Sequence, residues 1–438
     1  MTFRILAVLL VAGTVVTCPA AEVRPADSKA DANFAQQVSK LVSKLDSDRA
    51  ADRDAAEKEL LELAGETTAQ TDRFLASLPP DNDEMPLAVR DRLSRMRRQI
   101  EDRAAKGATN GTTITLDAKT MPLADVFKAI EKDTGNKLVD NREEPSDKPV
   151  TITLKDEPFW SAIDQILDQV GLGVYSYGGE EALSIVGRNN EEGPRVGQAA
   201  YRGPLRFEVL EVQAQRGQRQ PKQQSLKLQL EIAWEPRLRP IALSQPVADL
   251  EATTDTGEKL TATQPDAVQD VEIPNGTQAA EIQLPFELPS RDVKRITSLK
   301  GKLHALVPGR RAKFEFPDVT KSAGKSQRLG GVQVTLDDIR KNGAVYEIHM
   351  RFALEEANGS LQSHRNWVFQ NLSYLTDKDG KTIENAGFET TRQTPNEVGV
   401  AYLFDVVEGL DGLTWVYETP AAIVDLPVDY ELKDIELP

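Results

Sequence analysis

Cysteine and histidine are nearly absent from this chain of 438 residues, which holds one cysteine, Cys18, and three histidines. A single cysteine forms no internal disulfide and leaves no set of thiolate ligands for zinc. The histidines are His304, His349 and His364, and none belongs to a HExxH motif. Gly-x-Ser-x-Gly and Walker loops are also missing. These absences predict a protein that uses no cofactor and is not an enzyme.

Long apolar runs are confined to the N-terminus. Arg4 precedes an apolar run from Ile5 to Val16, which has the length of a secretory signal core and is too short to span a bilayer. We expect cleavage after Ala20, so that residues 1–20 are a signal peptide and the mature chain has no cysteine. The protein is then periplasmic or extracellular. Lipidation of Cys18, giving a lipoprotein, is the alternative.

Basic residues are outnumbered, 53 against 69 acidic ones, and the formal net charge is −16. This excess of negative charge disfavours nucleic acid and anionic membranes as partners, because both would be repelled. The densest basic run is Arg90 to Arg98. Acidic neighbours such as Asp91 and Glu101 favour its interpretation as a solvated helix face.

Residues 33–105 have the spacing of amphipathic helices. Apolar residues recur every three or four positions, as one buried helical face requires. The last helix carries Arg90 and Leu93 in an arrangement that resembles HEAT-type repeats. Fewer than three such repeats do not stand well alone, so we expect these helices to pack on a neighbouring domain.

Residues 112–188 have the clearest pattern. Two helices are expected, each opened at its first position by a proline and ended by a glycine. The prolines are Pro122 and Pro158, and the glycines are Gly135 and Gly171. Short alternating runs around them predict strands, which gives the order βαββαββ.

Two stretches of this module, MPLADVFKAIEKDTGNKLV and VTITLKDEPFWSAIDQILDQVGLGVYSY, resemble the secretin and TonB short N-terminal domain. The residues that match the pattern of its second helix are Ala162, Ile166, Leu167, Gly171, Leu172 and Tyr175. The resemblance implies a periplasmic interaction module rather than a catalyst. The pore-forming region and the receptor barrel of such proteins are missing from this chain. A plausible mode of binding is strand addition at an exposed edge of the module.

The remaining sequence predicts two tandem antiparallel β-sandwiches, at 203–318 and 328–438. Apolar residues alternate faultlessly around Leu230 and again around Met350, which indicates half-buried strands. Both halves also share a polar hairpin turn and a late strand, so we predict an internal repeat with one sandwich per copy. Final strands close the copies, with Phe314 and Phe316 in the first and Val428, Tyr430 and Leu432 in the second.

Candidate binding residues are few. Tyr175 and Tyr177 share one strand face and are predicted to line an exposed edge, and Trp367 and Phe369 follow a polar loop. Packing in a core is the alternative for all four. Asp377 and Asp379 are weak candidates for calcium, because oxygen ligands at alternate positions suit that ion. An ordinary Asp-Gly hairpin turn is favoured instead.

The sequence therefore predicts a multidomain α+β protein of the cell envelope that binds or assembles with an envelope or secreted protein, without catalysis. One alternative is a secreted carbohydrate- or peptide-processing enzyme with sandwich accessory domains. That enzyme requires a cleft with clustered carboxylates of perturbed pKa. The other alternative is a structural spacer of the envelope.

Overall fold

The computed structural model describes residues 25–65, 68–79, 85–143, 148–178, 182–189, 192–220, 224–274, 276–354 and 366–438. The expected signal peptide with Cys18 lies outside these ranges, as does His364. Strands predominate, and four of the five sheets among the described residues are antiparallel throughout. The chain is therefore a mostly β protein with separate helical parts. In the same residues no helix combines the length and the apolar character needed to cross a membrane.

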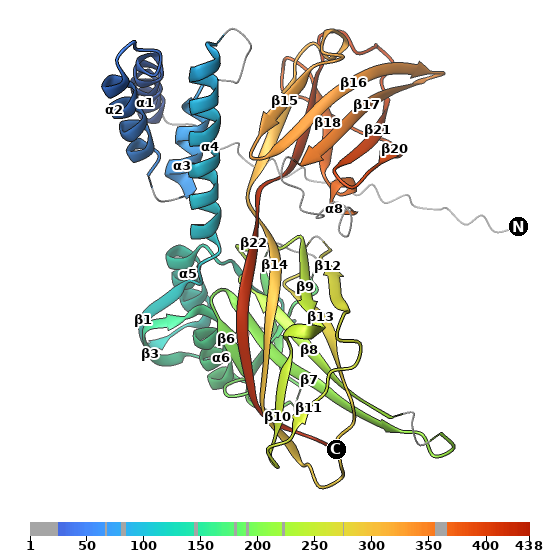
Figure 1. Ribbon diagram of the computed structural model, residues 1–438. Coiled ribbons are helices and arrows are strands. Elements are labelled where there is room, and N and C mark those ends of the chain that lie inside the picture. Colours follow the sequence, from blue (N-terminus) through green and yellow to red (C-terminus); the bar gives the residue numbers. More distant parts are fainter. Residues whose placement is uncertain are drawn as a thin grey trace, which may run out of the picture.

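Helices form the N-terminal part: α1 (Pro25–Lys44), α2 (Ala50–Leu63), α3 (Thr68–Ser77) and α4 (Leu87–Ala108). Their inward apolar residues meet in one small core, as the spacing predicts. Val38, Leu60 and Leu93 are completely buried there. α4 also packs along two long strands, β14 (Arg295–Phe316) and β22 (Thr414–Glu436), so the helices do rest on a neighbour (Figure 1).

A small module follows: β1 (Thr113–Met121), α5 (Leu123–Thr134), β2 (Leu138–Asp140), β3 (Val150–Pro158), α6 (Phe159–Val170), β4 (Leu172–Tyr175) and β5 (Leu183–Gly187). The expected order of elements is confirmed. β1 pairs with β3, while β5 pairs in parallel with β2 and antiparallel with β4. Gly135 and Gly171 end the helices in the left-handed conformation, with φ of 73° and 69°. Pro122 and Pro158 precede the first helical residue rather than occupying it, because both are extended.

The first lobe contains a sheet of β6 (Ala199–Arg202), β7 (Leu205–Arg216), β8 (Gln224–Trp234) and β13 (Ala279–Phe286). Facing it are β9 (Ala242–Pro246), β10 (Glu251–Thr254), β11 (Lys259–Leu260) and β12 (Val268–Glu272), with parts of β14 and β22. The alternating residues of β8 fill the space between these two sheets, as predicted from their spacing. A short 3-10 helix, Val247–Asp249, joins β9 to β10.

The second lobe contains a sheet of β15 (Ser326–Leu329), β16 (Val332–Asn342), β17 (Val345–Leu354), β21 (Glu397–Asp405) and β20 (Gly387–Gln393). Across its core lie β18 (Leu372–Thr376) and β19 (Thr382–Glu384), again with parts of β14 and β22. A 3-10 helix, Val319–Lys321, and the one-turn α8 (Asn366–Phe369) border this core. Both lobes are sandwich-like.

The last strand of each predicted copy crosses into the other lobe. β14 and β22 pair antiparallel from Arg295 opposite Glu436 to Phe316 opposite Trp415, and this ribbon runs through both lobes (Figure 1). Phe314 and Phe316, assigned above to the first sandwich, lie in the core of the second lobe. Val428, Tyr430 and Leu432, assigned to the second, lie in the core of the first. Both assignments were wrong because each strand continues beyond its own lobe without a break.

The small module is attached to the first lobe. Ala233 and Ala279, on the outer face of the β13-β8-β7-β6 sheet, belong to the same apolar core as α5 and α6. The indole Nε1 of Trp160 donates to the carbonyl oxygen of Pro204 at 3.1 Å. The module thus covers one end of the outer face of this sheet. Beyond it, that face carries polar residues such as Lys227, Gln229 and Glu281.

Candidate functional site

Two exposed tyrosines mark the border between the small module and the first lobe. Tyr175 ends the edge strand β4, and Tyr177 lies two residues further along the chain. Their ring centroids are 6.1 Å apart in an edge-to-face arrangement. Tyr175 is 51% exposed and Tyr177 41% exposed, which leaves aromatic surface of both rings accessible to a partner.

The tyrosine pair is held against the first lobe by a carboxylate of β13. The hydroxyl of Tyr177 donates to Oε1 of Glu281 at 3.3 Å, and the Gln229 amide donates to the other oxygen of the same carboxylate. The backbone adds a further link, since the N–H of Gln278 donates to the carbonyl of Ser176 at 2.8 Å. These bonds fix where the tyrosines stand relative to the sheet.

A row of three glutamates crosses the same face of this sheet. Glu231 of β8 lies directly opposite Glu208 of β7 on one side and Glu281 of β13 on the other. Carboxylates facing one another across strands destabilise a sheet unless cations or protons compensate them. Arg206 compensates Glu208 through an ion pair. We name Tyr175, Tyr177, Glu208, Glu231 and Glu281 the tyrosine–glutamate surface.

The electrostatics of this surface follow from the crowding of negative charge. Burial raises the pKa of the Glu231 carboxyl, the charges of Glu208 and Glu281 raise it further, and Arg206 opposes the rise. Burial also raises the pKa of the Tyr177 hydroxyl, and the charges of Glu231 and Glu281 act in the same direction. The phenol therefore stays neutral, and the glutamates gain from any cation that approaches.

A buried ion network holds the module and the sheet together beneath this surface. Asp164 of α6 has no exposed surface and accepts from Nε of Arg195 at 2.6 Å and from Nε of Arg206 at 2.8 Å. The hydroxyl of Tyr201 donates to the same carboxylate at 2.9 Å. Arg206 is thus shared between Asp164 and Glu208, and its charge offsets only part of the rise in the pKa of Glu231.

A second buried carboxylate joins the start of the module to the first lobe. Glu235 has no exposed surface and accepts from the backbone N–H of Thr112 at 2.7 Å. It also accepts from the Asn136 amide at 2.9 Å and from Nε of Arg237 at 2.7 Å. Because its hydrogen bonds reach residues of both parts, the module and the lobe are arranged as one unit around the tyrosine–glutamate surface.

The other aromatic candidates are placed differently. Trp367 is only 8% exposed and packs edge-to-face on Phe352, with ring centroids 5.3 Å apart. It is part of the core of the second lobe, which is the packing alternative offered by the sequence. Phe369 stacks on Phe388 at 5.6 Å, and Phe388 remains 42% exposed. Trp367 and Phe369 pack with the core of the second lobe, whereas Tyr175 belongs to the small module.

The weak calcium candidates form a hairpin turn between β18 and β19. Oδ1 of Asp377 accepts the backbone N–H groups of Asp379 and Lys381, both at 2.9 Å, and Gly380 has a φ of 80°. These bonds are those of an Asp-Gly turn. Within the ranges that the structure describes, no group of three or more histidine, cysteine or acidic side chains is arranged to hold a metal ion.

Sequence reasoning found the tyrosines but missed the glutamate row and the buried Asp164 network. The three glutamates are far apart in the sequence, and only strand register brings them together. The alternation of β8 held one usable signal. Glu231 lies between the inward residues Leu230 and Ile232, so alternation puts its side chain on the outer face of the sheet. Comparison of the chain with protein-family models, with curated proteins and with solved structures gave no match.

Proposed function

We propose that the protein is an exported, non-catalytic binding protein of the cell envelope, and that its tyrosine–glutamate surface docks a basic segment of a partner protein. Export is expected from the signal pattern of residues 1–20. The interaction role is expected from the resemblance of residues 112–188 to the secretin and TonB short N-terminal domain. The partner is an envelope or secreted protein.

One observation carries this proposal: two exposed tyrosine rings stand beside three glutamates in register. An arginine or lysine side chain gains from both components. Its charge is attracted to an aromatic face and forms charge-assisted hydrogen bonds with a carboxylate. An acidic or purely apolar segment gains from neither, so the surface favours basic partners.

Side chains rather than strand addition supply the contact at this place. β4 is an edge strand of four residues, and the carbonyl of Leu172 already accepts from Nε of Arg188 at 3.1 Å and from Nη2 of the same side chain at 2.8 Å. A short edge with an occupied carbonyl offers few backbone bonds to an added strand. The longer strands β1 and β3 have no second strand partner among the described residues, but they carry neither tyrosine.

The test measures binding of short extended peptides to the full mature chain by fluorescence anisotropy. The peptides share one length and differ only in basic, neutral or acidic side chains. We expect the basic series to bind, and Tyr177→Ala or Glu281→Gln to weaken it about ten-fold, equivalent to about 1.4 kcal/mol. Phe388→Ala removes an exposed aromatic elsewhere and serves as the control. Equal binding of basic and acidic peptides would contradict the proposal.

A glycan-processing enzyme is the second candidate, and the raised pKa of Glu231 favours it. A general acid in glycoside hydrolysis is a carboxyl of raised pKa that lies near a second carboxylate. Glu208 and Glu281 stand in that relation to Glu231. Turnover of any member of a glycan panel by the mature protein, lost in Glu231→Gln but retained in Glu431→Gln, would establish this activity in place of the first proposal.

A further inference from the structure

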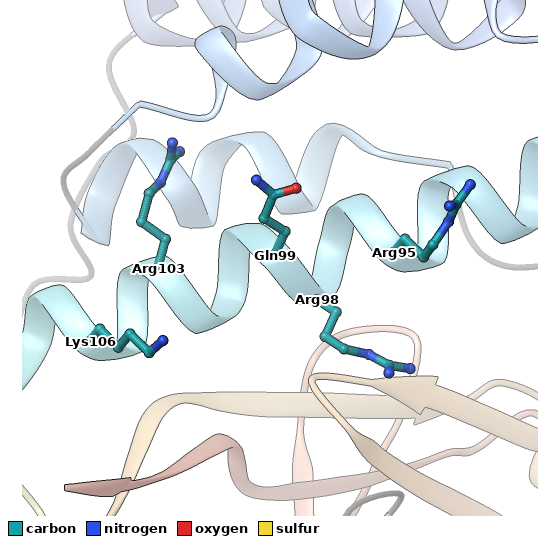
Figure 2. Close-up of a pocket in the computed structure, with 5 residues that line it drawn as sticks. All are labelled: Arg95, Arg98, Gln99, Arg103 and Lys106. Carbon is teal, nitrogen blue, oxygen red and sulfur yellow. The ribbon is translucent and has the colours of Figure 1, made fainter. Parts of the chain in front are cut away.

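A second surface, on the helical segment, has the opposite charge. Arg95, Arg98, Gln99, Arg103 and Lys106 of α4 line a hollow of about 520 Å³. Figure 2 looks onto this face of α4, with other helices on one side of it and strands on the other. The spacing of these residues places them on one face of the helix. We name this the basic hollow.

Other charged residues of α4 are engaged elsewhere. Arg92 pairs with Glu57 of α2, and Asp54 lies 3.3 Å from the same guanidinium. Glu101 is 6% exposed and is paired with Arg310 of β14. The acidic residue nearest in sequence to the centre of the basic hollow is therefore neutralised by another cation.

Three cations of the basic hollow, Arg95, Arg103 and Lys106, have no acidic partner within the described part of the chain. Nε of Arg95 donates to the backbone carbonyl of Asp91 at 3.4 Å. The guanidinium of Arg103 donates to the carbonyl of Gly65 at 2.7 Å. These bonds orient the side chains without cancelling their charge. Such a concentration of positive charge is unexpected on a protein whose net charge is −16, and it attracts anions locally.

The length of the basic hollow indicates an extended ligand. Arg95 and Lys106 are separated by about 16 Å along the helix axis at 1.5 Å per residue. One sulfate or carboxylate contacts only one or two of these cations at a time. A chain of repeated anionic groups contacts all of them and releases its own counterions on binding.

The lining chemistry separates the classes of polyanion. α4 has no aromatic residue, so bases of a single-stranded nucleic acid have no stacking partner. The lining residues are all polar, which leaves nothing to insert into a lipid surface. The amide of Gln99 both donates and accepts hydrogen bonds, and this suits the hydroxyl groups of a sugar. We propose that the basic hollow binds a chain of an acidic polysaccharide, independently of the tyrosine–glutamate surface.

The experiment measures binding of the full mature chain to polygalacturonate and dextran sulfate over a range of salt concentrations. Uncharged dextran, a single-stranded oligonucleotide and vesicles of anionic lipid are the comparison ligands. We expect the acidic polysaccharides to bind best. The triple variant Arg95→Gln/Arg103→Gln/Lys106→Gln should lose at least about ten-fold in affinity. The negative slope of log K against log salt should become shallower by about three.

The matched control is Lys132→Gln/Lys259→Gln/Lys378→Gln, which removes three exposed cations outside the hollow and changes the net charge equally. We expect it to bind like the parent chain. Because Arg103 also bonds Gly65, the double variant Arg95→Gln/Lys106→Gln tests the site if the triple variant does not fold. Equal loss in the control, no binding to either acidic polysaccharide, or tighter binding to the oligonucleotide or the vesicles would each overturn the proposal.

Discussion

Glu101 of α4 and Arg310 of β14 form an ion pair that fastens the helical segment to the ribbon shared by both lobes. Glu101 is 6% exposed and Arg310 14% exposed. The pair lies where α4 packs on β14 and β22, and no local sequence pattern predicts it. Two residues more than two hundred positions apart thereby hold α4, which carries the basic hollow, against the two long strands.

Removing one partner of this pair should destabilise the protein. Glu101→Ala leaves the Arg310 charge partly buried without compensation, and we expect a loss of about 3 kcal/mol in the free energy of unfolding. Urea denaturation measures it. The control on the same strand is Lys313→Ala, which breaks an exposed pair with Glu315 and should cost less than about 1 kcal/mol. Equal losses would show that burial of the first pair has no energetic consequence.

Gly301 tests the packing of the shared ribbon. It faces Tyr430 across β14 and β22, and a Cβ at this position would overlap the tyrosine ring. That ring stacks on Phe207 at 4.5 Å and cannot move away freely. Gly301→Ala should therefore cost about 1–3 kcal/mol through overpacking.

The matched control for this substitution is Gly107→Ala in α4. A Cβ there meets nothing within 4 Å, and alanine in a helix is more stable than glycine by about 0.5–1 kcal/mol. The two substitutions should therefore change the denaturation midpoint in opposite directions. A Gly301→Ala variant as stable as the parent chain would contradict the packing described for Tyr430.

The raised pKa of Glu231 predicts how the stability of the protein changes with pH. Its pKa is raised above the ordinary value of 4.5, chiefly by burial, so the folded state holds the proton more tightly than the unfolded state. Stability then decreases as pH rises from about 4.5 through the folded pKa. Glu231→Gln removes this loss and should be more stable than the parent chain at neutral pH, with the difference vanishing in acid.

Thermal denaturation of Glu231→Gln across this pH range is the measurement. Glu431→Gln is the control with the opposite sign, because a hydrogen bond from Ser298 lowers the pKa of Glu431. It should lose stability at neutral pH and regain it in acid. A Glu231→Gln variant that is less stable at neutral pH would mean that the row of glutamates is compensated by cations.

The sequence predicted what depends on neighbours in the chain. The βαββαββ order followed from local signals, of which Gly135 and Gly171 are the clearest. The helical core and the alternation in β8 and β17 followed from apolar spacing. Tyr175 and Tyr177 were singled out as exposed aromatic residues two positions apart, but the prediction of a shared strand face was wrong for Tyr177, which lies in the turn after β4.

What the sequence could not predict depends on register and on partner choice. The alternation of Phe314 and Phe316 shows that one face of a strand is buried, but not in which lobe. Likewise, Glu208, Glu231 and Glu281 meet only because three strands align at those positions. The two buried networks around Asp164 and Glu235 involve the same difficulty, since each joins parts of the chain that no local pattern links.

Because β14 and β22 each contribute to both cores, the fold can be distinguished by experiment from two independent sandwiches. Leu432 is near the C-terminus but lies in the first core, whereas Leu336 of β16 lies in the second. Leu432→Ala and Leu336→Ala delete the same atoms and should each cost about 2–5 kcal/mol. Hydrogen exchange should then rise in β7 and β8 for Leu432→Ala, and in β16 and β17 for Leu336→Ala. Faster exchange of β16 and β17 in Leu432→Ala, with β7 and β8 unchanged, would contradict this arrangement. The last strand would then belong to the second lobe, and the predicted boundary between two separate sandwiches at residues 318–328 would hold.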